Sequence, residues 1–281
     1  MNFEFAALYL SSALPPIILG LIIWKSDRFQ EPGKYLLASF LLGVAIIFPL
    51  DFFIIVTENI LAPLLGLDVE FYRDWNEGGW KETGAVFPVA EAAFQNFFRA
   101  AFLEEGLKFA LLIFFCVRLA DLNEPMDTIV YGAAIGLGYA AIENLGYLSA
   151  SSLENAWTME MVKVRYYPLI MHMGFGVVMG LFLSQNLFEE RSLFKRRLML
   201  ILSLIIPVIF HGVYNYYGTA DIFPMLTLIL VIGVIYYFRR EQLQKITEGV
   251  DKARIENIDV FYSYMLTLLL VILIVFSAIM F

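Results

Sequence analysis

Two adjacent carboxylates and a lysine are the residues whose types and spacing best suit chemistry. Glu104 and Glu105 are followed by Lys108 within the largely apolar stretch 94–117. Residues three and four apart share a helix face, so Lys108 can meet either carboxylate. Two neighbouring carboxylates in a low dielectric do not both stay charged unaided. If Lys108 neutralises one, the other is left to accept a proton as a general base. The alternative is a buried ion pair that only fixes helix packing.

The chain has two histidines, and both fall in apolar stretches. His211 is followed four residues later by Asn215, so the two side chains face the same way on a helix. Two imidazoles and an amide can hold a water, donate to an oxyanion or bind a metal. A third carboxylate, Glu143, lies in another apolar stretch and shares a helix face with Tyr139. For His172 and His211, the alternative is packing with a hydrogen bond to backbone.

These residues predict a polar chamber among helices, in which Glu104 deprotonates water for attack on a carbonyl. His172, His211 and Asn215 would hold that water and stabilise the oxyanion, which amounts to peptide-bond hydrolysis. No serine or cysteine lies in a nucleophile motif, and the zinc-helix signature H-E-x-x-H is absent. Zinc chemistry stays open, with His172, His211, Glu104 and Glu143 as candidate ligands. The favoured expectation is that the protein uses no cofactor. Asparagine, present here as Asn215, is common as an oxyanion donor and rare as a zinc ligand.

The elements that position these residues are predicted to be membrane helices. The 281 residues are 60% hydrophobic and 16% charged, whereas soluble domains average about 45–50% and 25%. A membrane-crossing helix needs about 20 apolar residues. Eight stretches qualify: 6–24, 35–56, 94–117, 129–150, 166–187, 198–217, 222–238 and 260–281. We therefore expect an all-α fold with about eight transmembrane helices. It would form a single polytopic domain over residues 1–281, with a motif-bearing core at about 94–217.

The distribution of basic residues predicts the orientation of these helices. Thirteen of the 19 Lys and Arg fall in loops on one side of the predicted spans and five on the other. Basic residues gather in cytoplasmic loops, so both termini are expected outside, in a multi-pass protein of the cell membrane. The first stretch has no signal-peptide features, so it is expected to be a retained helix. The net charge of −8 disfavours nucleic acid as a partner.

Taken in order, the motifs resemble those of the PrsW family, over roughly residues 94–217. The resemblance is carried by Glu104-Glu105-x-x-Lys108, the stretch around Glu143, His172, and His211-x-x-x-Asn215. PrsW proteins are multi-span membrane proteases that cut a membrane-bound anti-sigma factor. The order is also similar to that of the CAAX prenyl endopeptidases and their bacteriocin-processing relatives. That group has an Arg four residues after the second Glu, whereas Lys108 comes three after, which favours the PrsW branch.

The resemblance implies an intramembrane protease whose partners are the bilayer and a membrane-anchored protein substrate. By resemblance, Glu104 is the water-activating base and Glu105 pairs with the cation, while the histidines and Asn215 bind water and oxyanion. The role of Glu143 is open. The candidate catalytic residues are thus Glu104, Glu105, Lys108, Glu143, His172, His211 and Asn215. The family is often classed with metalloproteases, so the resemblance leaves zinc undecided.

Two other classes of protein also fit intramembrane ionisable residues. One is a proton-coupled transporter, because such residues form relays. Transporters often show internal repeats, and this sequence has none that we detect. The other is a non-catalytic membrane scaffold, as in the distantly similar anterior-pharynx-defective subunit of gamma-secretase. The intact Glu104–Glu105 pair argues against a scaffold.

Overall fold

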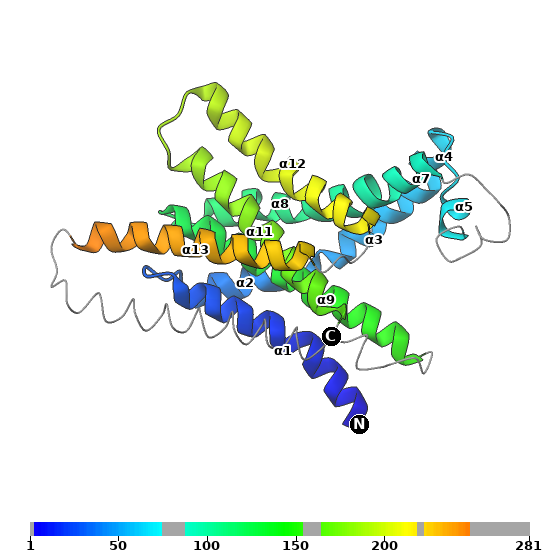
Figure 1. Cartoon of the computed structure of the whole chain (residues 1–281), viewed down its shortest axis with the longest axis horizontal. Coiled ribbons are helices and arrows are strands. Elements are labelled where there is room, and N and C mark those ends of the chain that lie inside the picture. The colour runs from blue at the N-terminus through cyan, green and yellow to red at the C-terminus, as the bar shows by residue number, and fades with distance from the viewer. Residues whose placement is uncertain (1–2, 75–87, 154–163, 218–221, 248–281) are drawn as a thin grey trace.

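The structure, a computed structural model, describes residues 3–74, 88–153, 164–217 and 222–247 (Figure 1). Over these ranges the chain is helical and contains no strand, which confirms the predicted all-α class for this part. The segments in order are α1 (Phe3–Ser26), α2 (Gly33–Ala45), α3 (Ile47–Val56), η1 (Thr57–Leu61), α4 (Ala62–Leu64), α5 (Val69–Asp74), α7 (Val89–Ala93), η3 (Phe94–Phe102), α8 (Leu103–Phe114), η4 (Cys116–Arg118), α9 (Pro125–Leu153), α11 (Tyr166–Leu187), α12 (Leu193–Tyr217) and α13 (Ile222–Thr247).

The first seven predicted spans fall on helical segments of the structure. Within the described residues, four helical segments are long and apolar enough to cross a membrane: Gly33–Leu64, Tyr166–Leu187, Leu193–Tyr217 and Ile222–Gln242. The eighth predicted span, 260–281, lies outside the described residues. Length and composition therefore indicate a membrane protein, as the sequence predicted.

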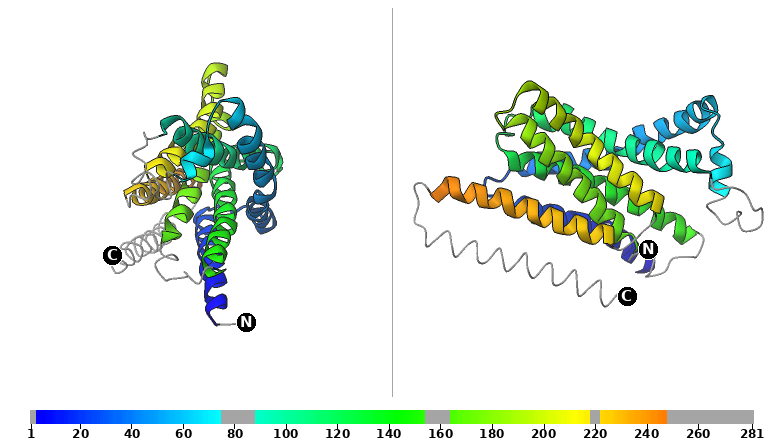
Figure 2. Two further views of the ribbon diagram at one scale, coloured as in Figure 1. Left: turned by 90° about the vertical axis from the view of Figure 1, so that its right-hand side faces the viewer. Right: turned by 45° about the horizontal axis from the view of Figure 1, so that its top comes forward.

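Helix α9 forms the centre of the bundle. Every residue from Met126 to Ala140 is buried, as expected for a helix that is apolar on nearly all its faces. It packs against α1, α2, α8, α11 and α13, and the end-on view in Figure 2 shows other helices on several sides of it. Side chains on α9 are therefore held rigidly from several directions.

Glycines on α9 allow α11 to approach closely. A Cβ at Gly132 would collide with the carbonyl oxygen of Gly176, and a Cβ at Gly136 would collide with that of His172. Small residues four apart permit this approach of two backbones inside a membrane. Gly132 and Gly136 therefore serve helix packing, and this packing holds His172 directly against α9.

A π-helical segment, η3, leads without a break into α8 and its two carboxylates. Such segments are rare and often mark functional sites. Segment η3 packs on α12, where the ring of Phe97 fills the space that a Cβ at Gly212 would need. Gly212 directly follows His211. The contact with Phe97 therefore places η3, which continues into α8, next to the histidine of α12.

Candidate active site

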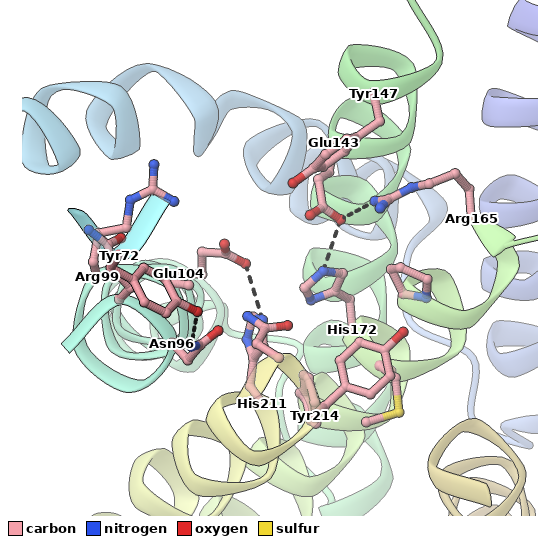
Figure 3. A pocket seen from close by; sticks show the side chains of 16 residues that line it. Tyr72, Asn96, Arg99, Glu104, Glu143, Tyr147, Arg165, His172, His211 and Tyr214 are labelled. Carbon is pink, nitrogen blue, oxygen red and sulfur yellow. Dashed lines mark hydrogen bonds and ion pairs between the residues drawn. The ribbon is translucent and has the colours of Figure 1, made fainter. Parts of the chain in front are cut away.

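A cavity of about 420 Å³ is lined mainly by residues of η3, α8, α9, α11 and α12 (Figure 3). Five of the seven candidate residues line it, and the other two lie beneath its wall. The lining five are Glu104, Glu143, His172, His211 and Asn215. Glu105 and Lys108 are 0% and 1% exposed. The structure thus brings together residues from four separate helices that the sequence selected.

Lys108 lies closer to the carboxylate of Glu105 than to that of Glu104. Its Nζ lies 2.8 Å from Oε1 of Glu105 and 3.9 Å from Oε2 of Glu104. The ammonium also sits 4.1 Å from the ring centroid of Tyr139, a cation–π contact. Oε2 of Glu104 is buried and accepts no hydrogen bond from the described residues. Lys108 therefore neutralises Glu105 and leaves an oxygen of Glu104 available, as the spacing predicted.

The contacts of His172 determine where its proton lies. Its Nδ1 is 2.9 Å from Nζ of Lys108, and its Nε2 is 3.1 Å from Oε2 of Glu143. An ammonium can only donate, so Nδ1 accepts from Lys108. The neutral ring then carries its proton on Nε2, which donates to Glu143 at the cavity wall. His172 therefore presents an N–H group to the cavity.

His211 has the opposite arrangement. Its Nδ1 lies 2.8 Å from Oε1 of Glu105, and this nitrogen donates to the carboxylate. The Nε2 lone pair then faces Oε2 of Glu104 at 3.8 Å, as Figure 3 shows. That distance is too long for a direct hydrogen bond. A water lying off the line between the two atoms can bond to both.

Glu143 has a counter-charge that sequence reasoning overlooked. Nη2 of Arg165 donates to Oε2 of Glu143 at 2.9 Å, and its Nε donates to Oδ1 of Asn144 at 2.9 Å. From the sequence, Arg165 entered only the count of outer-side bases. The sequence feature that could have indicated this pairing was the position of Arg165 directly before the helix that carries His172. Arg165 fixes the start of α11 to the carboxylate end of the site.

Tyr214 is a second residue that the sequence did not single out. Its hydroxyl is buried, finds no hydrogen-bond partner in the part of the chain that the structure describes, and belongs to a side chain that lines the cavity. Tyr214 lies three residues after His211, and this helical spacing could have identified it. Arg99, also on the cavity wall, pairs with Glu58 at 3.0 Å.

Ionisable groups of opposite sign, buried among apolar helices, define a helical membrane protein with an intramembrane polar site. Residues 31–240 match the PrsW family, described as intramembrane metalloproteases, and the chain belongs to this family. Protease PrsW from Bacillus subtilis (strain 168) is 32% identical over 207 residues, which cover 73% of this chain and 80% of the relative.

Two further relatives give the same assignment. Protease PrsW from Geobacillus kaustophilus (strain HTA426) is 31% identical over 205 residues, or 72% of this chain and 75% of the relative. Protease PrsW from Clostridioides difficile (strain 630) is 26% identical over 249 residues, or 88% and 94%. No solved structure matches the chain. The family resemblance inferred from the motifs is confirmed.

The family's description raises the question of whether these residues suit a zinc ion. Glu104, Glu105, His172 and His211 each offer one ligand atom, and these atoms lie within 4.8 Å of one another. Their types suit zinc. The ammonium of Lys108, however, already contacts Glu105 at 2.8 Å and His172 Nδ1 at 2.9 Å. The positive charge of Lys108 among these ligand atoms would repel a divalent cation, so the residues as arranged do not fit zinc.

Proposed function

We propose that this chain hydrolyses a peptide bond of a membrane-anchored protein, using water activated by Glu104. The observation that carries the proposal is the pairing of two groups across the cavity wall. Oε2 of Glu104 is buried without a hydrogen bond, and Nε2 of His211 faces it at 3.8 Å. A water held by both atoms has two acceptors for its protons, which leaves its oxygen lone pairs free to attack.

The reaction then follows the general-base scheme. Glu104 takes a proton from the water, and the water oxygen bonds to the carbonyl carbon of the scissile peptide. The carbonyl oxygen becomes an oxyanion. As the intermediate collapses, the carbon–nitrogen bond breaks, and protonated Glu104 returns its proton to the leaving amine. Membership of the PrsW family supports peptide hydrolysis as the reaction class.

Three donors at the cavity are placed to stabilise the oxyanion. His172 presents Nε2–H, which it now shares with Glu143 at 3.1 Å. The amide of Asn215 and the unpartnered hydroxyl of Tyr214 belong to the cavity lining. Donors held in position before substrate arrives need no reorganisation during the reaction, which is why such groups lower a barrier.

Glu105 and Lys108 act as positioning residues in this scheme. Glu105 receives His211 Nδ1–H and Lys108 Nζ at 2.8 Å each. These contacts fix the tautomer of His211 so that its Nε2 remains an acceptor for water. Glu143, anchored by Arg165, would fix His172 in the same way from the other side.

The proposal includes the membrane arrangement. We propose about eight transmembrane helices in the cell membrane, with both termini outside. The bias of basic residues toward one set of loops supports this orientation. The four long apolar helices support a multi-pass protein.

The test is cleavage of candidate single-span membrane proteins by the purified chain in proteoliposomes, beside Glu104→Gln. The wild type should produce two fragments, whereas the variant should bind the substrate without cutting it. Solute flux that both forms support, without cleavage, would identify a transporter instead. Assembly of a partner complex by both forms, without cleavage, would identify a scaffold.

A further inference from the structure

A second group of acids lies near the opposite end of α9 from Glu143. Asp127 lies in the first turn of α9, and Glu143 comes 16 residues later, which is about 24 Å along a helix. The loop between α1 and α2 contributes Asp27, and Glu124 lies just before α9. Each of the three acids offers a carboxylate oxygen, and these oxygens lie within 4.8 Å of one another. This acidic cluster shares no residue with the candidate active site.

Two oxygens of the acidic cluster receive no hydrogen bond from the described residues. Asp27 and Asp127 are 1% and 0% exposed. Oδ1 of Asp27 accepts hydrogen bonds, and so does Oδ2 of Asp127, but Oδ2 of Asp27 and Oδ1 of Asp127 accept none within the part of the chain that the structure describes. A buried oxygen without a partner is costly, and a buried charge without compensation is more so. A positively charged ligand would compensate both oxygens.

The hydrogen bonds around the cluster hold the other oxygens in place. Backbone N–H groups of Asn123 and Glu124 donate to Oδ2 of Asp127 at 2.7 and 2.8 Å. Nε2 of Gln242, on α13, donates both to Oδ1 of Asp27, at 2.9 Å, and to Oε1 of Glu124. Three separate segments thus present their carboxylates in a fixed arrangement.

We propose that Asp27, Glu124 and Asp127 bind a divalent cation. All the candidate ligands are oxygens, which hard cations such as Ca²⁺ and Mg²⁺ prefer. Each of the three acids offers one carboxylate oxygen close enough to the other two to share one ion. Ca²⁺ accepts a wider range of ligand geometries than Mg²⁺, so it is the probe for this site.

A bound cation would tie the α1–α2 loop to the start of α9 and, through Gln242, to α13. These segments lie on the side of the membrane where the basic loops gather, which is the predicted cytoplasmic side. A small surface hollow lined by Glu124, Glu241 and Gln242, among others, adjoins one acid of the cluster. The cation would stabilise the position of the helix that carries Glu143 and would take no part in hydrolysis.

Calcium binding to the full-length chain in detergent is the test. The protein is stripped with a chelator, and binding of radioactive Ca²⁺ is measured by equilibrium dialysis beside thermal melting. We expect one Ca²⁺ per chain and a melting temperature that rises with Ca²⁺ but not with K⁺ at matched ionic strength. Absence of calcium binding by the wild type would overturn the proposal, whatever the variants do.

Matched variants separate this site from the active site. Asp127→Asn keeps an acceptor for the two backbone N–H groups but removes charge, and Glu124→Gln does the same at a less buried position. Each should weaken Ca²⁺ binding by at least about tenfold, since affinity follows ligand charge. Glu104→Gln should leave it unchanged. Equal loss in Glu104→Gln would place the ion at the active site. Variants that melt higher without binding Ca²⁺ would mean that the acids share protons instead.

Discussion

The rings of His172 and His211 lie edge to face with their centroids 5.2 Å apart, and they face the cavity with opposite hydrogen-bonding character. The contact of His172 with Lys108 places its proton on Nε2, whereas the contact of His211 with Glu105 places the proton on Nδ1. One imidazole therefore offers a donor and the other an acceptor. A nucleophilic water and a developing oxyanion need one of each.

The first prediction concerns the acceptor at His211. The amide nitrogen of Asn in His211→Asn can replace Nδ1 and still donate to Glu105, but nothing replaces Nε2. We expect nearly normal thermal stability and a loss of cleavage of at least about 100-fold, in the range of general acid–base contributions. Melting curves and a fragment assay check the two parts. His211→Leu, which also removes the donor to Glu105, should lose about 1–3 kcal/mol of stability. Unchanged cleavage by His211→Asn would rule out a role for Nε2.

The second prediction contrasts Lys108 with Glu104. Lys108→Ala leaves Glu105 buried without its counter-charge, which costs about 3–5 kcal/mol in comparable buried pairs. It should lower both the folded yield and the activity. Glu104→Gln keeps the shape of a side chain whose Oε2 accepts no hydrogen bond from the described residues, so it should fold normally and be inactive. Yields that fall equally in both variants, measured by size-exclusion chromatography, would make Glu104 a structural residue.

The third prediction tests the hydroxyl of Tyr214. Tyr214→Phe removes a buried group without a hydrogen-bond partner, so the variant should be at least as stable as the wild type. If the hydroxyl donates to the oxyanion, kcat should fall by about 10²–10³-fold with little change in KM. Steady-state kinetics on a cleaved peptide reporter distinguish the outcomes. A rise in KM at constant kcat would assign Tyr214 to substrate binding instead.

Much of this site could be predicted because burying ionisable groups in a membrane requires partners. The types and spacing of Glu104, Glu105 and Lys108 indicated a shared contact, and the contact distances agree. The four-residue spacing of Gly132 and Gly136 is typical of close helix packing, and a Cβ at either glycine would collide with the backbone of α11. The pairing of Arg165 with Glu143 depends on how two helices cross, and no periodicity along one helix contains that information.

The fourth prediction concerns the packing that holds His172. Gly136→Ala places a methyl group against the carbonyl oxygen of His172, which should destabilise the fold by about 1–3 kcal/mol and lower activity. At Gly146, on the same helix, an added Cβ would meet no atom of another described element within 4 Å. Gly146→Ala should therefore be neutral or stabilise by up to about 1 kcal/mol through helix propensity. Thermal melts of the two variants side by side test this, and equal destabilisation would contradict the packing argument.

The last prediction concerns metal. Zinc would compete with the Lys108 ammonium for Glu105 and His172, which Lys108 contacts at 2.8 and 2.9 Å. We therefore expect cleavage to survive stripping with a strong chelator, once Ca²⁺ has been returned and zinc content verified by elemental analysis. Activity that disappears and returns with one zinc per chain would overturn the glutamate mechanism. His172 and His211 would then be ligands, and Lys108 would have to leave its present contacts.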